Sequence, residues 1–285
     1  MKGRMVFVHG LTPIHTGTGQ SVDVIDLPVA REKPTNWPYI PGSSIKGVLR
    51  DAYTDVEGFP IKDLFGPDKI ENDNGSAGML LFSDARLLCL PVRSFYGTFA
   101  WTTCPTALRR LRRDSVNATG NPLFDEWTTS LVDEQAVVCT QSDLCPGGKI
   151  YLEDLDVDKA ADQNADAWAK AIAEAVFESK PEQEAFMKRF AVISDDLFTV
   201  LTETATDVVA RIRINDDTKT VAKGGLWYEE AVPSESIFSF PLLAAPRNGV
   251  KVFESVDKNW AGLVQIGGNA SVGRGLVRLV LTKEA

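Results

Sequence analysis

The sequence predicts an α+β fold. Short apolar runs typical of strands alternate irregularly with helical patterns along the chain, and there is no internal repeat or low-complexity segment. Hydrophobic residues make up 44% of the 285 residues and charged residues 24%, a balance that supports an ordinary folded core. No apolar run reaches the ~18 residues that a membrane helix needs, and the N-terminus is too short and interrupted for a signal peptide. We therefore expect a cytoplasmic protein that does not contact a membrane.

The N-terminal region begins with an apolar segment, residues 3–9, that predicts a strand. A loop rich in Gly, Thr and Pro follows, and then a partly strand-like segment that carries Asp23 and Asp26. The next motif, PYIPGSSIKGVLR, predicts a helix over residues 43–54. Pro41 and Gly42 interrupt what precedes it, Ser43 or Ser44 can accept a hydrogen bond from an early helical N–H, and the apolar residues recur at helical spacing.

This predicted helix has the features of a phosphate site. Its first turn offers free N–H groups and the hydroxyls of Ser43 and Ser44, and Lys46 and Arg50 add positive charge. Gly47 costs a helix interior about 1 kcal/mol relative to alanine, so its presence indicates that something approaches closely there. An ordinary capped amphipathic helix with solvated basic residues is the alternative, and this stretch alone leaves both open.

The remaining elements follow from apolar periodicity. We expect strands within residues 75–97 and at 134–139, 149–153, 208–214 and 235–245, and helices at 102–115, 164–179 and from 181 onward. Residues 102–115 place Thr102 or Thr103 near the helix cap. In the strand 208–214, Arg211 and Arg213 alternate with isoleucines, which predicts a half-buried strand with a basic face. A polar, projecting hairpin (215–233) follows, and residues 262–281 predict strand, glycine-rich loop and strand.

Charge and cysteine usage limit the function classes. The net charge of −9 argues against a general nucleic-acid binder, but the arginine-rich run 107–114 and the acidic run 151–166 leave a local basic face possible. A solvated basic helix is the alternative interpretation of that run. The four cysteines lack C-x-x-C spacing, so buried thiols in a reducing compartment are expected and zinc is not.

The chemistry-bearing residues give several open interpretations. The loop 266–275 is glycine-rich but lacks the ending of a phosphate-binding P-loop, so a tight hairpin connection is an equal alternative. His15 lies in a loop among Thr and Gly and is expected to be exposed. Asp26 is either a site acid or a solvated acid at a strand edge. Serine-nucleophile and H-E-x-x-H motifs are absent, and a metal ion would be a loosely bound Mg²⁺ on carboxylate and phosphate oxygens.

In order along the chain, seven stretches resemble one family: LTPIHTGTG, VIDLPVARE, YIPGSSIKGVLR, LFGPD, GMLLFSDARLLCLPVRS, LWYEE and QIGGNASVGRGLVRL. The chain is thereby similar to the backbone subunits of type III-B CRISPR (Cmr) effector complexes, within the RAMP superfamily. The resemblance spans nearly the whole chain, and residues 115–190 contribute least. It implies a single RAMP domain over residues 1–285, with a ferredoxin-like (RRM-type) core, an insertion at about 115–190 and a projecting β-hairpin "thumb" at about 215–230.

The resemblance also implies a function. Copies of the chain would stack with other subunits of the complex as a helical filament along a guide CRISPR RNA. The thumb of each copy would interrupt the guide–target duplex. Each copy would cut the single-stranded RNA target at regular intervals as an endoribonuclease in antiviral defence, with Mg²⁺ or Mn²⁺ that is absent without target RNA.

The roles of individual residues come from the same resemblance. Asp26 corresponds to the principal catalytic acid and metal ligand, and His15 to a histidine near the site. The acidic pair of LWYEE corresponds to Glu229 and Glu230. Ala231 stands where some members carry an aromatic residue, which leaves Tyr228 to fill that place. The RNA-binding residues implied are Ser43, Ser44, Lys46, Gly47 and Arg50, with Gly267, Gly268, Asn269, Gly273, Arg274 and Gly275 of the glycine-rich loop.

Two other function classes remain open from the sequence. One is a scaffold that holds guide RNA in the same filament without cutting, which the lack of a dense carboxylate cluster favours. The other is an unrelated α+β enzyme that binds a nucleotide through the glycine-rich loop. Stabilisation against heat by a nucleotide, and not by guide RNA, would distinguish the latter.

Overall fold

The computed structural model describes residues 2–19, 24–67, 77–160, 164–245 and 252–283. Asp23, one of the two acids noted in the sequence, lies outside these ranges. The strands are β1 (Lys2–Gly10), β2 (Tyr39–Ile40), β3 (Leu80–Phe82), β4 (Ala85–Arg93), β5 (Phe99–Thr103), β6 (Gln135–Val138), β7 (Lys149–Leu152), β8 (Leu155–Lys159), β9 (Phe190–Ile193), β10 (Asp207–Ile214), β11 (Val221–Ala231), β12 (Ile237–Ala244), β13 (Leu263–Gln265) and β14 (Leu276–Leu281). The helices are α1 (Gly42–Tyr53), α2 (Ile61–Phe65), α3 (Pro105–Thr119), α4 (Asn164–Val176), α5 (Lys180–Arg189), α6 (Asp195–Thr204) and α7 (Val252–Asn259), with a 3₁₀ turn at Ala270–Val272.

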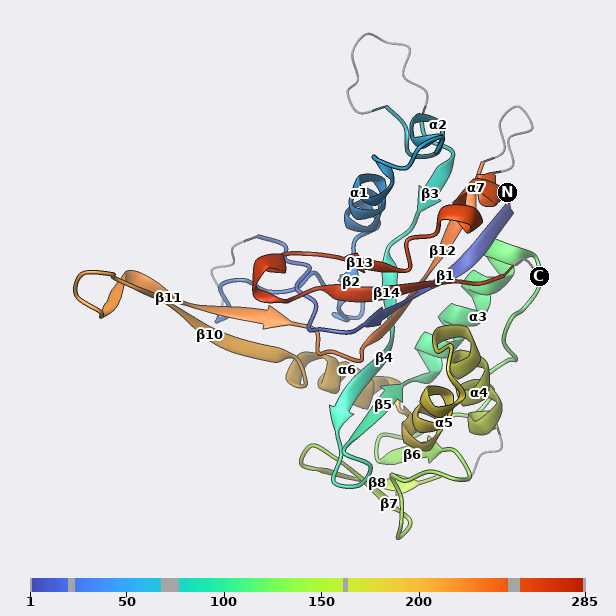
Figure 1. The fold of residues 1–285 in the computed structure, drawn as a ribbon. Helices are drawn as coiled ribbons and strands as arrows, with labels where there is room; N and C mark the ends of the chain where they lie inside the picture. The colour runs from blue at the N-terminus through green and yellow to red at the C-terminus, as the bar shows by residue number, and fades with distance from the viewer. Residues whose placement is uncertain (1, 20–23, 68–76, 161–163, 246–251, 284–285) are drawn as a thin grey trace.

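One large sheet organises the molecule (Figure 1). Its order is β13-β14-β1-β12-β4-β5-β9-β6-β8-β7, with β2 beside β4 and β3 beside β12. Most neighbours are antiparallel, whereas β5 with β9 and β6 with β8 are parallel. The predicted α+β class is therefore confirmed.

Alternation along β1 shows why the sheet has a core on each face. Val6 and Val8 join the core that includes α1, α2 and α7, whereas Met5 and Phe7 join the core formed with α3, α4 and α5. Successive side chains of a strand point to opposite faces, so a strand buried on both sides has to be apolar throughout. This explains the continuous apolar run that predicted the first strand.

The ends of several elements differ from the prediction. Helix α3 starts at Pro105 with Cys104 as its N-cap, and Thr102 and Thr103 belong to β5 instead. Helix α1 starts at Gly42 with Pro41 as its N-cap and no side-chain cap, so the expected capping role of Ser43 or Ser44 is wrong. The carboxylate of Asp84, in the connection between β3 and β4, takes that role, as described below.

Helix α6 and strand β9 were not expected from the sequence. The apolar run Phe190–Ile193 is too short to be assigned by periodicity, because a four-residue run fits a helix or a strand equally. Ser194 then caps α6 by accepting a 3.1 Å hydrogen bond from the N–H of Leu197.

Three cysteines are buried and all four are free thiols, as predicted. Within the described residues, none of the helices has the length and apolarity to cross a bilayer.

Candidate functional site

Strands β10 and β11 form an antiparallel ribbon that projects away from the main sheet (Figure 1). This ribbon, residues 207–231, is called the thumb below, and it begins earlier than the predicted 215–230. Facing residues share one side of a ribbon. One side carries Ala210, Ile212, Leu226 and Tyr228. The other side, called the arginine face, carries Arg211, Arg213, Trp227 and Glu229.

Asp26 lies against the base of the thumb. Leu27 forms a parallel bridge with Glu229: its N–H donates to the Tyr228 carbonyl oxygen at 3.1 Å, and its carbonyl accepts from the Glu230 N–H at 3.0 Å. The Tyr228 N–H donates to Oδ2 of Asp26 at 2.8 Å. The segment around Asp26 therefore pairs with β11 through one isolated bridge, and the half-buried carboxylate is held beside that strand.

Glu230 is buried below this edge, with 2% of its surface exposed. Its carboxylate accepts hydrogen bonds from the Arg31 guanidinium, from the Thr206 hydroxyl at 2.9 Å and from the Val29 N–H at 3.0 Å. All these donors belong to the Asp26 segment or to the chain entering β10. The geometry favours a positioning role for Glu230, and its expected catalytic role stays a prediction.

Glu229 is held by three donors on the arginine face. It accepts from Trp227 Nε1 at 2.8 Å, from Arg211 Nε at 3.2 Å and from Asn269 Nδ2 at 3.0 Å. Burial raises the pKa of Glu229, but the hydrogen bonds from Trp227 and Arg211 and the nearby arginine charges outweigh it, and the net pKa lies below the ordinary value. Glu229 is therefore ionised at neutral pH, and it ties the thumb to the glycine-rich loop.

His15 is only 7% exposed, so the expectation of an exposed histidine is wrong. The glycine-rich loop covers it: the Gly268 N–H donates to the His15 carbonyl at 2.9 Å, and a Cβ on Gly267 would lie 2.3 Å from that oxygen. Nδ1 of His15 lies 2.6 Å from the Glu230 carbonyl oxygen. Because a carbonyl only accepts, Nδ1 carries the proton. The ring is thus fixed in one orientation beside the thumb base.

The glycine-rich loop joins the same cluster through Arg274. This side chain is 8% exposed, and its Nη1 has no hydrogen-bond partner among the residues described. Gly273 and Gly275 have positive φ values of 82° and 77°, and a Cβ on Gly275 would meet the Ile266 carbonyl oxygen at 2.1 Å. These glycines are required by the turn itself.

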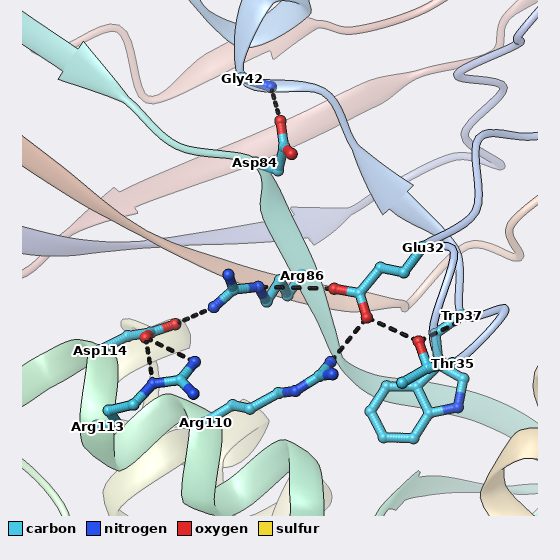
Figure 2. Close-up of polar contacts among 9 residues, drawn as sticks. All are labelled: Glu32, Thr35, Trp37, Gly42, Asp84, Arg86, Arg110, Arg113 and Asp114. Carbon is cyan, nitrogen blue, oxygen red and sulfur yellow. Dashed lines mark hydrogen bonds and ion pairs between the residues drawn. The ribbon is translucent and has the colours of Figure 1, made fainter.

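The other predicted RNA-binding element, α1, stands apart from this cluster and has an open side. Ser43 and Gly47 are exposed, and Ser44, Lys46 and Arg50 are half-buried. A Cβ on Gly47 would have no atom within 4 Å. The N-terminus is less open, because Asp84 Oδ1 accepts from the Gly42 N–H at 2.8 Å (Figure 2). A phosphate would meet the exposed side of α1 more readily than its first N–H.

The arginine-rich run on α3 is largely neutralised within the fold (Figure 2). Arg110 donates to Glu32 at 2.8 Å and lies over the Trp37 ring, and Arg113 pairs with Asp114. Arg86 of β4 bridges both acids, at 3.6 Å from Glu32 and 2.8 Å from Asp114. The run is thus not a merely solvated basic helix, because Glu32 of another segment pairs with Arg110 and Asp114 of α3 itself pairs with Arg113.

Sequence reasoning placed Asp26, His15, Glu229, Glu230 and Tyr228 at the site, and the structure brings them together at the thumb base. It did not identify the partners that hold them, Arg31, Thr206, Arg211 and Trp227. Only the alternating arginines of β10 gave a signal in the sequence, as a predicted basic face.

The predicted metal ligand Asp26 has one carboxylate oxygen that accepts a hydrogen bond from Tyr228 and one without a partner among the described residues. Within these residues no group of three or more His, Cys, Asp or Glu side chains could hold a metal ion.

Comparison with known proteins supports one family. The model of the RAMP superfamily matches residues 7–278. A curated relative, the CRISPR system Cmr endoribonuclease Cmr4 of Pyrococcus furiosus, is 37% identical over 99% of this chain and 96% of its own length. A crystal structure of oligomeric Cmr4 from the same organism has a TM-score of 0.78 at 30% identity, covering 99% of this chain and 98% of that one.

A second structure agrees in fold alone. A chain in the cryo-EM structure of a type III-B Cmr-beta complex bound to cognate target RNA has a TM-score of 0.76 at 22% identity, covering 99% of this chain and 97% of that one. The matches in sequence and in fold cover nearly the whole chain. The chain therefore belongs to the RAMP superfamily.

Proposed function

We propose that the chain is the repeating backbone subunit of a type III-B CRISPR ribonucleoprotein. In this proposal it works in the cytoplasm, binds guide CRISPR RNA, and cleaves complementary target RNA at regular intervals with a divalent metal ion. The endoribonuclease named among its relatives supports this, as does the oligomeric crystal structure. The observation in this chain that carries the proposal is the Asp26 carboxylate, held by the Tyr228 N–H at the open edge of a projecting ribbon.

The expected RNA contacts divide between two surfaces. The exposed side of α1, with Ser43, Lys46 and the bare backbone at Gly47, suits a phosphate backbone that approaches closely. The glycine-rich loop adds Arg274, whose buried Nη1 has no partner among the described residues and would bind a further phosphate once RNA displaces what covers it. The core on which these surfaces lie is proposed to be ferredoxin-like, supported by the antiparallel β1, β12 and β4 with α3 packed against them.

In the cleavage step, the thumb would splay a target nucleotide out of the duplex, so that its 2′-hydroxyl can align with the adjacent phosphate. In-line geometry is rare in a stacked A-form helix, and positioning therefore supplies much of the rate. Asp26 accepts the hydroxyl proton or holds the metal ion through its free oxygen. A single carboxylate suits an ion that is shared with RNA phosphate oxygens, and such an ion would stabilise the developing negative charge.

One observation favours a second candidate, a scaffold that binds RNA without cutting. Glu229 and Glu230 are buried and each accepts three hydrogen bonds, so Asp26 is the predicted carboxylate most open to RNA. In this case the same filament would form, and another subunit would perform the chemistry.

Cleavage of a labelled RNA target by the assembled, guide-loaded complex tests the proposal, with Mg²⁺ or Mn²⁺ and with wild type compared to Asp26→Asn. Evenly spaced products ending in a cyclic or 3′-phosphate, lost in the variant while target binding persists, are expected. Substantial cutting by the variant would remove Asp26 from the mechanism. If the wild-type complex binds target RNA tightly but forms no products, the result would support the second candidate, the scaffold that does not cut.

A further inference from the structure

The pocket beside Asp26 contains an arginine that the fold itself does not use. This open pocket of about 400 Å³ is lined by Asp26, Arg213 and Trp227 together with Gly224 and Gly225. Arg213 is exposed and, in contrast to Arg211, forms no ion pair or hydrogen bond with any described residue. A carboxylate and an unpaired guanidinium therefore face one space without neutralising each other.

An irregularity of the ribbon forms this pocket. Ile212 pairs with Leu226 and Ile214 pairs with Val221, so two steps along β10 correspond to five along β11. The additional residues of β11 include Gly224, whose φ of 68° suits glycine, and the buried Gly225. A bulge of this kind bends a strand and re-aims the side chains opposite it. It lies directly across from Arg213.

The glycines also keep the pocket open. A Cβ on Gly225 would lie 2.8 Å from the Ala222 carbonyl oxygen and 3.1 Å from that of Arg213, so the strand needs glycine there. Trp227 forms the opposite wall, and its indole is fixed by the 2.8 Å bond from Nε1 to Glu229. Arg213 can thus reach the same space as Asp26 across a part of β11 that has no side chain.

We propose that this pocket binds the scissile phosphodiester, with Arg213 as a catalytic residue that contacts its non-bridging oxygens. The inference rests on the proposed function and names the group that stabilises its transition state. A guanidinium offers two parallel N–H donors that match a phosphate, and such a donor acts most strongly where negative charge develops.

The step balances with water as the only further reactant. The target 2′-oxygen forms a bond to phosphorus, its proton goes to the carboxylate of Asp26, and the bond from phosphorus to the 5′-oxygen breaks. The 5′-oxygen keeps the electron pair and takes a proton from water, and the hydroxide that is left removes the proton from Asp26 and restores its carboxylate. The products are a 2′,3′-cyclic phosphate and a 5′-hydroxyl. Arg213 stays protonated throughout and stabilises the extra charge on the five-coordinate phosphorus.

The test compares wild type, Arg213→Gln, Arg213→Lys and Lys223→Gln in the guide-loaded complex at fixed ionic strength. The measurements are the single-turnover cleavage rate and the dissociation constant for target RNA. Lys223 is an exposed cation of β11 that does not line the pocket, so its variant controls for the loss of one thumb charge. Thermal melting of each variant checks that the fold is intact.

We expect Arg213→Gln to cleave about 100-fold more slowly than wild type, the effect of removing one transition-state donor, with target affinity within about three-fold. Arg213→Lys restores part of the rate because it keeps the charge but not the two-donor geometry. Lys223→Gln behaves as wild type. Cleavage by Arg213→Gln at the wild-type rate overturns this inference alone. The same holds if Lys223→Gln loses as much of the cleavage rate as Arg213→Gln does. Absence of cleavage by wild type overturns the proposed function and this inference with it.

Discussion

The N–H of Tyr228 donates a 2.8 Å hydrogen bond to the carboxylate of Asp26, although 202 positions separate the two residues. The bond couples the candidate catalytic acid directly to the thumb. A displacement of the thumb therefore moves or releases the carboxylate, so that the geometry of the site depends on how the ribbon is held. Glu230 and Glu229 hold the base of the thumb in place, through Arg31 and Thr206 in one case and through Arg211 and Asn269 in the other.

Loss of the Glu230 carboxylate should destabilise the fold. Glu230→Ala leaves the guanidinium of Arg31, only 16% exposed, with two carbonyl acceptors but without its carboxylate partner, and breaking a buried ion pair in this way costs about 3–5 kcal/mol. Urea denaturation measures this free energy of unfolding. The control Glu203→Gln alters an exposed hydrogen bond to Asn36 and should change it by less than about 0.5 kcal/mol. A small effect of Glu230→Ala would remove Glu230 as an anchor.

Gly47→Ala should separate stability from RNA binding. The new Cβ has no neighbour within 4 Å, and alanine in a helix interior is favoured over glycine by about 1 kcal/mol, so the melting temperature should rise. If guide RNA approaches the bare backbone, the affinity for guide RNA falls in the same variant. Melting curves and RNA titrations measure the two effects. A rise in both would contradict close approach at this residue.

The lowered pKa of Glu229 predicts a dependence of stability on pH. A carboxyl whose pKa is lower in the folded state contributes stability above its ordinary pKa of 4.5, and this is lost as pH falls through the folded value. The free energy of unfolding should therefore decrease with acidification below about pH 4.5, and Glu229→Gln should reduce that slope. Denaturant titrations between about pH 3 and 6 provide the comparison. Identical slopes in both proteins would exclude this contribution.

The cysteines should differ sharply in reactivity. Burial raises the pKa of Cys139 to about 12, and it raises those of Cys89 and Cys104 as well. The thiolate is the reactive form, so these three should resist a thiol reagent until the chain unfolds, whereas the half-buried Cys145 reacts in the native state. Mass spectrometry of alkylated protein identifies the labelled residue. Rapid labelling of Cys89 under native conditions would contradict its burial.

The fold was predictable from the sequence where packing is periodic. Residues 43–54 gave helix α1 within one residue at each end because its apolar spacing is regular, whereas the four-residue strand β9 left no period to detect. Capping of α1 was not predictable, since Asp84 reaches it from 42 positions away.

The candidate site was predictable in its acids and not in their environments. Local composition gave no indication that the glycine-rich loop covers His15, that Glu32 pairs with Arg110 of α3, or that Arg86 bridges Glu32 and Asp114. These contacts join segments that are distant in the sequence, and one sequence carries no record of such pairings.

The isolated ribbon has a further consequence for the free chain. Its outer half has only its own partner strand, and Ile212, Ile214, Val221 and Leu226 are each more than half exposed. Two strands alone are marginally stable in water. Backbone amides near the tip should therefore exchange hydrogen for deuterium quickly, whereas those at Tyr228 and Glu230 are protected by the Asp26 segment. On assembly, protection of these amides from exchange should spread from the base of the thumb to its tip. In the unassembled chain, the exposed apolar side of the thumb favours self-association.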